Sequence, residues 1–219
     1  MNQQIEEKTA ELIRLLEEEY GFKVVTERQP NFNEQSERLY KRLREIGSGG
    51  TDDERIKWAM EKSQMGFINL DKADLSDLDL HHVDLSGINL AGANFAGSNL
   101  EWVNLSGAKC MLADFTKANI HLTNMVGVLA INANFSESSI TGARCRGATF
   151  TYANFSNAYI EQTDFSNSIF VGAEFDGAII EDTRFDYASG HLQQLKKAQI
   201  RSIILTLNAK QARAALITL

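Results

Sequence analysis

The chain has 219 residues, of which 43% are hydrophobic and 23% are charged, as is usual for a soluble protein. Its net charge of −7 is unevenly spread: residues 67–185 contain 14 acidic and 6 basic residues, whereas residues 186–219 contain 1 acidic and 5 basic residues. The acidic middle region disfavours direct nucleic-acid binding. With no apolar run long enough to span a membrane and no signal-peptide pattern at the N-terminus, we expect a cytoplasmic protein that does not enter a membrane.

Residues 1–66 are predicted to form an α-helical N-terminal module. Helices are expected over 3–20, from about 33 to 46, and from Thr51 to about 65, with the flexible stretch "GSGG" before the third. Thr51 and Glu54 fit a capping box. The module either caps the region that follows, through its third helix, or forms a separate binding domain.

From Leu70 to Phe185 a sizeable apolar residue recurs every five residues, and a small residue usually stands two positions before it. The series has 24 members without an insertion, and only Ala130 is not a sizeable apolar residue. A period of five fits neither an α-helix nor a flat strand. Both residues are expected to face inward, so that each unit is one very short straight side followed by a corner. Asn or Asp precedes the apolar residue in 14 units, and its side chain can hydrogen-bond to the nearby backbone.

A second period of twenty residues indicates how the sides close. Every fourth member of the series gives columns of like residues, one of which reads Leu75, Phe95, Phe115, Phe135, Phe155 and Phe175. A coil of four sides is therefore predicted, and coils would stack at the inter-strand distance of about 4.8 Å. Cys110 and Cys145 belong to the series, so both are expected to be buried thiols and not a disulfide.

The units "ADLSD", "VDLSG", "ANFAG", "ADFTK" and "ANFSN" resemble those of the pentapeptide-repeat family, A-(D/N)-L-x-x. The resemblance covers about 120 residues of the 219. It implies a mainly β fold, a right-handed quadrilateral β-helix solenoid of about six coils over residues 67–187. The leucine-rich repeat has one consensus per 20 to 29 residues, so its period does not fit.

Residues 188–219 are predicted to be a C-terminal helical cap or a dimerisation segment. Their apolar residues include the run "SIILTL", which is more apolar than a small cap needs. Relatives in the family use a C-terminal extension for pairing, so the resemblance also allows a homodimer through this segment.

The repeat region shows no catalytic motif, so we expect no enzyme activity, no cofactor and no metal site. His81, Glu101 and His121 share one outward column, but parallel side chains on a flat face do not converge easily on a metal ion. We interpret them as a solvated polar row.

The candidate site is an apolar stripe on one side of the predicted rod. It groups outward positions of successive coils, and such a patch usually marks a covered or binding surface. Its residues are Met111, Leu112, Leu129, Ile131, Tyr152, Ile169 and Val171. Either the ends of the chain cover this stripe, or a protein partner or second copy binds there.

Two functions follow from these observations. The first is a non-enzymatic protein–protein interaction or scaffold protein that binds an unknown protein partner through the apolar stripe. The alternative is a DNA-mimic inhibitor or protector of DNA gyrase or topoisomerase, because the family includes such members and the rod is acidic. The charge density is well below that of duplex DNA, with one charge per about 1.7 Å.

Overall fold

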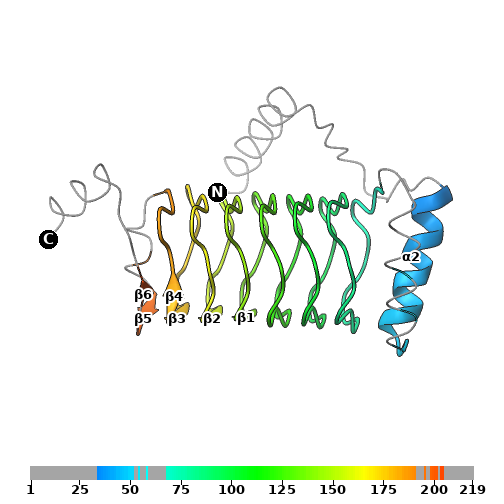
Figure 1. The fold of residues 1–219 in the computed structure, drawn as a ribbon, viewed down its shortest axis with the longest axis horizontal. Coiled ribbons are helices and arrows are strands. Elements are labelled where there is room, and N and C mark those ends of the chain that lie inside the picture. Colours follow the sequence, from blue (N-terminus) through cyan, green and yellow to red (C-terminus); the bar gives the residue numbers. More distant parts are fainter. Residues whose placement is uncertain are drawn as a thin grey trace, which may run out of the picture.

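The computed structural model forms a rod of stacked coils with a helix at one end (Figure 1). Helix α2 (Glu34–Gly47) stands against the first coil, and the labelled strands lie toward the other end. The predicted helix 3–20 and most of the third predicted helix lie outside the described residues. The structure describes residues 34–51, 54, 58, 68–190, 195, 198–201 and 203–204.

Parallel pairing at a constant spacing of twenty residues builds the rod. One sheet has the order β1 (Ser139–Thr141), β2 (Tyr159–Glu161), β3 (Ile179–Glu181) and β5 (Gln199–Ile200). Strand β4 (Thr183–Arg184) pairs in parallel with β6 (Ile203–Ile204). Isolated bridges from Asn69↔Asn89 to Ile169↔Ser189 keep the same spacing. Twenty residues therefore make one coil of four five-residue sides, which confirms the predicted β-helix.

The five-residue series lines the interior, as predicted. Leu70 and Phe185 at its two ends are fully buried, and all members of the series between them belong to one continuous hydrophobic core. The rings of Phe115 and Phe135 stack with centroids 4.7 Å apart, and those of Phe135 and Phe155 with centroids 4.9 Å apart. This spacing equals the distance between paired strands, so the rings form a ladder along one wall. Phe95 and Phe175 extend it at both ends.

The corners share one backbone conformation. We count positions from the sizeable apolar residue of each unit, which is the inward-facing residue meant below. In every unit from Lys72 to Tyr187, the second residue after it has a positive φ, between 46° and 72°. The carbonyl of the inward-facing residue accepts a hydrogen bond from the residue three positions later in many units, for example from Ala73 to Leu70 at 3.1 Å. This pattern fits a type II turn, in which only the third residue takes a positive φ. We call the two residues after each inward-facing residue the first and second corner positions.

Asparagine side chains connect these corners within and between coils. The Asn104 Oδ1 atom accepts a hydrogen bond from the main-chain N–H of Ser106, at 3.1 Å. The same oxygen accepts a second bond from Asn124 Nδ2 on the next coil, at 3.0 Å. The local bond confirms the prediction from the sequence. The bond between coils was not predicted. It could have been, because Asn and Asp recur at intervals of twenty residues, which places them next to one another on neighbouring coils.

Helix α2 covers the N-terminal end of the stack. Leu39, Leu43 and Ile46 are buried in the same core as the first coil. The Gly47 carbonyl accepts a hydrogen bond from the Asp79 N–H at 2.9 Å, so α2 satisfies an otherwise free edge of the coil. A capping role was expected of the third predicted helix, of which the structure describes Thr51, Glu54 and Trp58.

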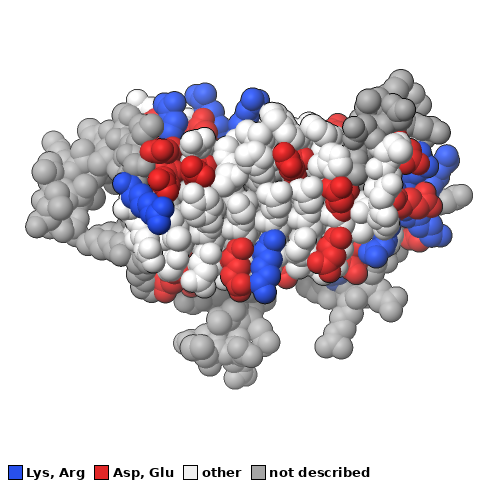
Figure 2. All heavy atoms as spheres, turned by 90° about the horizontal axis from the view of Figure 1, so that it is seen from below, with Lys and Arg blue, Asp and Glu red and all other residues white. Residues whose placement is uncertain are grey.

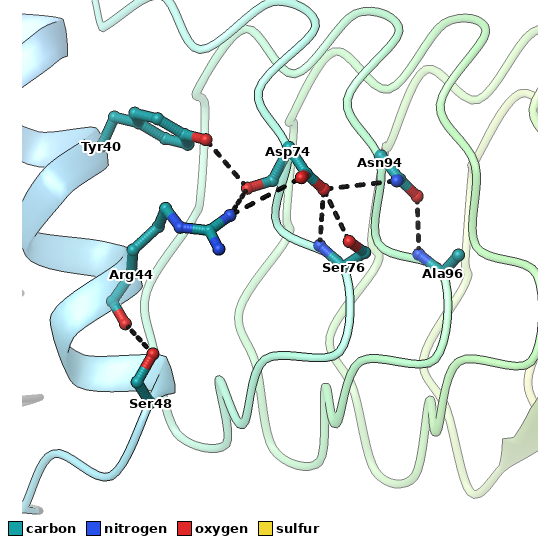
Figure 3. Close-up of polar contacts among 7 residues, drawn as sticks. All are labelled: Tyr40, Arg44, Ser48, Asp74, Ser76, Asn94 and Ala96. Carbon is teal, nitrogen blue, oxygen red and sulfur yellow. Dashed lines mark hydrogen bonds and ion pairs between the residues drawn. The ribbon is translucent and has the colours of Figure 1, made fainter.

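Asp74 connects α2 to the first coil (Figure 3). Tyr40 Oη and Arg44 Nη1 donate hydrogen bonds to its main-chain carbonyl at 3.1 and 2.7 Å, and Arg44 Nη1 lies 3.7 Å from its carboxylate. The Ser76 hydroxyl donates a hydrogen bond to that carboxylate, and this bond lowers the pKa of Asp74. Burial of the carboxylate raises the pKa, whereas the Ser76 N–H, the charge of Arg44 and the Asn94 side chain lower it further.

The C-terminal segment differs from the helical cap that we predicted. Residues 199–204 contain the short strands β5 and β6, and bridging continues past residue 187 to Ser189. The last coil offers free main-chain groups, and the N–H groups of Gln199 and Arg201 bind the carbonyls of Ala178 and Ile180 at 2.7 and 2.9 Å. The β-branched isoleucines of this segment suit a strand. Residues 205–219 lie outside the described part.

The ladder predicts that Phe135→Ala destabilises the rod by about 3–5 kcal/mol, because the ring leaves a cavity between two stacked neighbours. Urea unfolding followed by circular dichroism measures the change. Phe135→Leu retains most of the volume and should cost clearly less. A loss below about 0.5 kcal/mol for the alanine variant, as at an exposed position, would contradict the ladder.

The contacts between α2 and the first coil predict that Asp74 contributes to the free energy of unfolding and that acid removes this contribution. Because its folded-state pKa is lowered, the contribution is complete above about pH 4 and is lost as the pH falls through the folded-state value. The difference in the free energy of unfolding between wild type and Asp74→Asn should therefore shrink from pH 7 to pH 2. Asp77→Asn on the same coil, outside these α2 contacts, is the control. An Asp74→Asn difference that did not depend on pH would contradict this role.

Candidate functional site

The two histidines of the outward column, His81 and His121, contact neighbouring side chains. Within the described residues, no group of three or more His, Cys, Asp or Glu side chains could hold a metal ion. The Nδ1 atom of His81 lies 2.7 Å from Asp79 Oδ1, and that of His121 lies 2.6 Å from Thr141 Oγ1. These short contacts tie both imidazoles to neighbours on the rod.

The two cysteines are buried and free, as predicted. Burial raises the pKa of Cys110 to about 12. Burial, together with the negative charge of Asp164, also raises the pKa of Cys145. Since the thiolate is the nucleophilic form, neither side chain is suited to covalent catalysis at neutral pH.

The seven residues of the apolar stripe lie on one side of the rod. The N–H of Leu112 donates to the carbonyl of Ile131 at 2.9 Å, and that of Tyr152 donates to Val171 at 2.8 Å. Leu129 and Ile169 both bridge to Thr149, which lies between them. The repeat register therefore brings these residues together as the sequence predicted.

The stripe is divided into covered and open parts. Met111 and Ile131 are buried, and Leu129 is partly buried. The open part consists of four side chains that are 39% to 50% exposed: Leu112, Tyr152, Ile169 and Val171. The sequence pattern identified these positions as outward-facing but could not separate the covered residues from the open ones.

Tyr152 lies against the backbone of the following coil. A Cβ atom added at Gly172 would come within 2.2 Å of the Tyr152 ring, and Gly172 itself has a φ of +70°. Glycine therefore permits both the turn and the close approach of the ring. An aromatic ring that is supported on one face and open on the other is a suitable anchor for a partner.

The charges around the stripe differ from those on the rest of the rod. Between residues 69 and 172, the outward positions on this side of the rod include one carboxylate, that of Asp71. They also include two basic residues, Lys72 and Lys109. Asp71 Oδ1 and Lys72 Nζ are buried without a hydrogen-bond partner. Burial lowers the pKa of Lys109. Lysines rather than acids thus border the apolar residues.

Elsewhere the acidic residues are scattered and partly neutralised. On the face seen in Figure 2, Asp and Glu side chains form separate groups, and some have Lys or Arg beside them. Lys117 lies 3.6 Å from Glu137, and Arg201 lies 3.1 Å from Glu181. The rod therefore does not present a continuous row of unpaired carboxylates on that face.

Trp102 is a second exposed aromatic residue, on a different side. The residue is 48% exposed, and its ring stacks on that of His82 with centroids 6.1 Å apart. Tyr187 is also exposed, at 55%. Both residues occupy second corner positions. The register that identified Trp102 as outward-facing applies equally to Tyr187, so the sequence could have identified Tyr187 in the same way.

The chain is similar to proteins built from five-residue repeats. A family model described as "Pentapeptide repeats" (8 copies) matches residues 73–109, 93–129 and 131–167. A pentapeptide repeat protein from the Arabidopsis thaliana thylakoid lumen is 30% identical, over 48% of this chain and 66% of that one, with a TM-score of 0.21. The chain thus spans just under two thirds of the length of that protein.

Two further solved structures are more distant in sequence. QnrB1, a plasmid-mediated fluoroquinolone resistance protein, is 15% identical over 68% of this chain and 93% of that one, with a TM-score of 0.30. HetL, a pentapeptide repeat protein involved in heterocyst differentiation regulation in Nostoc sp. strain PCC 7120, is 16% identical over 68% and 95%, with a TM-score of 0.17. No curated protein sequence matches the chain.

The burial of the two cysteines predicts that neither reacts in the folded protein. In N-ethylmaleimide at pH 8, intact-mass spectrometry should show no adduct on the native chain and two adducts after unfolding in urea, because the chain has two cysteines. Rapid modification of the native protein would show that Cys110 or Cys145 is accessible as a thiolate, contrary to its raised pKa.

Proposed function

Residues 73–129 and 131–167 belong to the pentapeptide-repeat family, and we propose that the chain is a non-enzymatic interaction or scaffold protein. It would bind a protein partner through the apolar stripe. The observation that carries this proposal is the open part of the stripe, where Leu112, Tyr152, Ile169 and Val171 are all exposed on one side.

The chemistry of this patch suits a protein partner. Tyr152 offers a large ring with one polar atom, and Ile169 and Val171 offer branched apolar surface beside it. Full burial of such a side chain contributes about 1.5–3 kcal/mol, and these side chains are still about half accessible. The rod holds them on a hydrogen-bonded scaffold, which limits the ordering cost of association.

A second copy of the chain is one candidate partner, through the C-terminal segment. Strands β5 and β6 stand last in their sheets among the described residues, and Ile200 is 42% exposed. An exposed strand edge with an apolar side chain favours pairing with another chain. No helix in the described residues is long and apolar enough to cross a membrane. The cytoplasmic location stays a prediction from the sequence.

Gyrase inhibition or protection by DNA mimicry is the second candidate function. The excess of acidic over basic residues between 67 and 185, 14 against 6, favours it. The ion pairs of Glu137 and Glu181 count against it, because a DNA mimic needs closely spaced unpaired charges. A supercoiling assay in which a large excess of the protein leaves gyrase unaffected would remove this candidate.

The open part of the stripe predicts that Ile169→Asp combined with Val171→Asp abolishes partner binding. The charges would have to be buried against the partner without compensation. Crosslinking and affinity capture compare this variant with wild type, and light scattering reports any homodimer.

Val126→Asp provides a matched control, because Val126 is 40% exposed in another column of the rod. Each of these exposed substitutions should change the free energy of unfolding by no more than about 0.5 kcal/mol. Unchanged capture and an unchanged oligomeric state in the double variant would contradict the role of the stripe.

A further inference from the structure

The covered part of the apolar stripe has an unusual burial for its position. Met111 and Ile131 both occupy first corner positions, which face outward, yet they are only 5% and 6% exposed. Val126 and Val171 occupy the same position in other units and are 40% and 41% exposed. Ser166 and Asp186 are also buried at this position, but both are polar and form hydrogen bonds with nearby side chains. The exposure of Val126 and Val171 shows that an apolar side chain at this position is not buried by the coils alone.

The described elements at the two ends do not account for this burial. Helix α2 stands at the first coil, and β5 and β6 lie at the opposite end, with the coils of Met111 and Ile131 between them (Figure 1). An outward apolar row that is covered in the middle of a rod needs an occupant that runs along its side.

We propose that this occupant is the N-terminal segment 3–20 of the same chain, docked as an amphipathic helix over Met111 and Ile131. The inference rests on the proposed function, since the segment would hold part of the surface that a partner binds. It makes the apolar stripe a self-occupied binding site, with Tyr152, Ile169 and Val171 left open.

The chemistry of the segment matches that of the row. Its apolar residues recur at helical spacing, and Leu12 and Leu16 fall on one face. Six glutamates in the segment oppose one lysine and one arginine, so it is acidic. The side of the rod that it would cover carries Lys72 and Lys109 against one carboxylate, Asp71, so its outward charge is on balance basic. Opposite charges at the edges of an apolar contact favour one orientation over others.

The C-terminal tail is a poorer match for the same surface. Residues 205–219 contain Lys210 and Arg213 and no acidic residue. Their charge has the same sign as that of Lys72 and Lys109, so docking there would place like charges together. Charge complementarity thus selects the N-terminal segment.

The connection to α2 gives the segment the necessary reach. The N–H of Asn69 donates to Ser36 Oγ near the start of α2, at 3.2 Å, and Asn69 begins the same side of the rod as the stripe. A helix of 18 residues is about 27 Å long. The three coil steps from Asp71 to Ile131 span about 14 Å. Residues 21–33 would remain as the connection.

Thiol labelling of the full-length chain tests this proposal without any partner. Ile131→Cys and Val171→Cys place single reactive groups in the covered and open parts of one row, and the two native cysteines are buried. Ile131→Cys should react about tenfold or more slowly than Val171→Cys. Adding Leu12→Asp and Leu16→Asp should accelerate Ile131→Cys about tenfold or more and leave Val171→Cys unchanged.

Leu207→Asp combined with Leu216→Asp, in the tail, is the matched control and should leave both rates unchanged. Acceleration by the tail variant, or by dilution of the protein, would overturn the proposal in favour of the tail or a second copy. Slow labelling that persists in the Leu12 and Leu16 variant would also overturn it. Because no partner enters the measurement, its failure is distinguishable from failure of the capture experiment.

Discussion

Main-chain hydrogen bonds between coils hold each residue beside the residue twenty positions away in the chain. Strands paired in this way lie about 4.8 Å apart, and the stacked rings of Phe115 and Phe135 lie 4.7 Å apart. Because the two spacings agree, a column of identical rings packs without distortion. The same constraint aligns the asparagine side chains, whose amides bond from coil to coil as between Asn104 and Asn124. The interior, the corners and the outward columns all follow from this single spacing.

The same spacing makes the two ends of the rod and its sides functionally different. A coil at either end lacks a neighbour, so its main-chain groups need another partner. Helix α2 provides contacts at one end through Gly47 and Asp74, and β5 and β6 continue the pairing at the other. The sides are free to vary, because outward side chains do not determine the fold. On one side this freedom has produced an apolar stripe, in which Met111 is buried and Tyr152 is exposed.

Much of the fold could be predicted from the sequence, because the repeat signal is local and regular. The period of five identified the inward-facing residues, and the period of twenty identified the columns, including the Phe135 ladder. The end at β5 and β6 could not be predicted in the same way, since residues 191–198 interrupt the series and "SIILTL" suits a helix or a strand. The outward direction of the stripe was predictable, but the burial of Ile131 was not, because the repeat gives it the same register as the exposed Val171.

A distance measurement along one column tests the coil spacing most directly. Spin labels on Asp77→Cys and Asn157→Cys, both at exposed second corner positions, would be separated by four coils. The native cysteines are buried and should not take the label. Double electron–electron resonance should give one maximum near about 19 Å, four steps of about 4.8 Å. A maximum displaced by more than about one such step, or a broad distribution without a maximum, would contradict the stacking of residues at intervals of twenty.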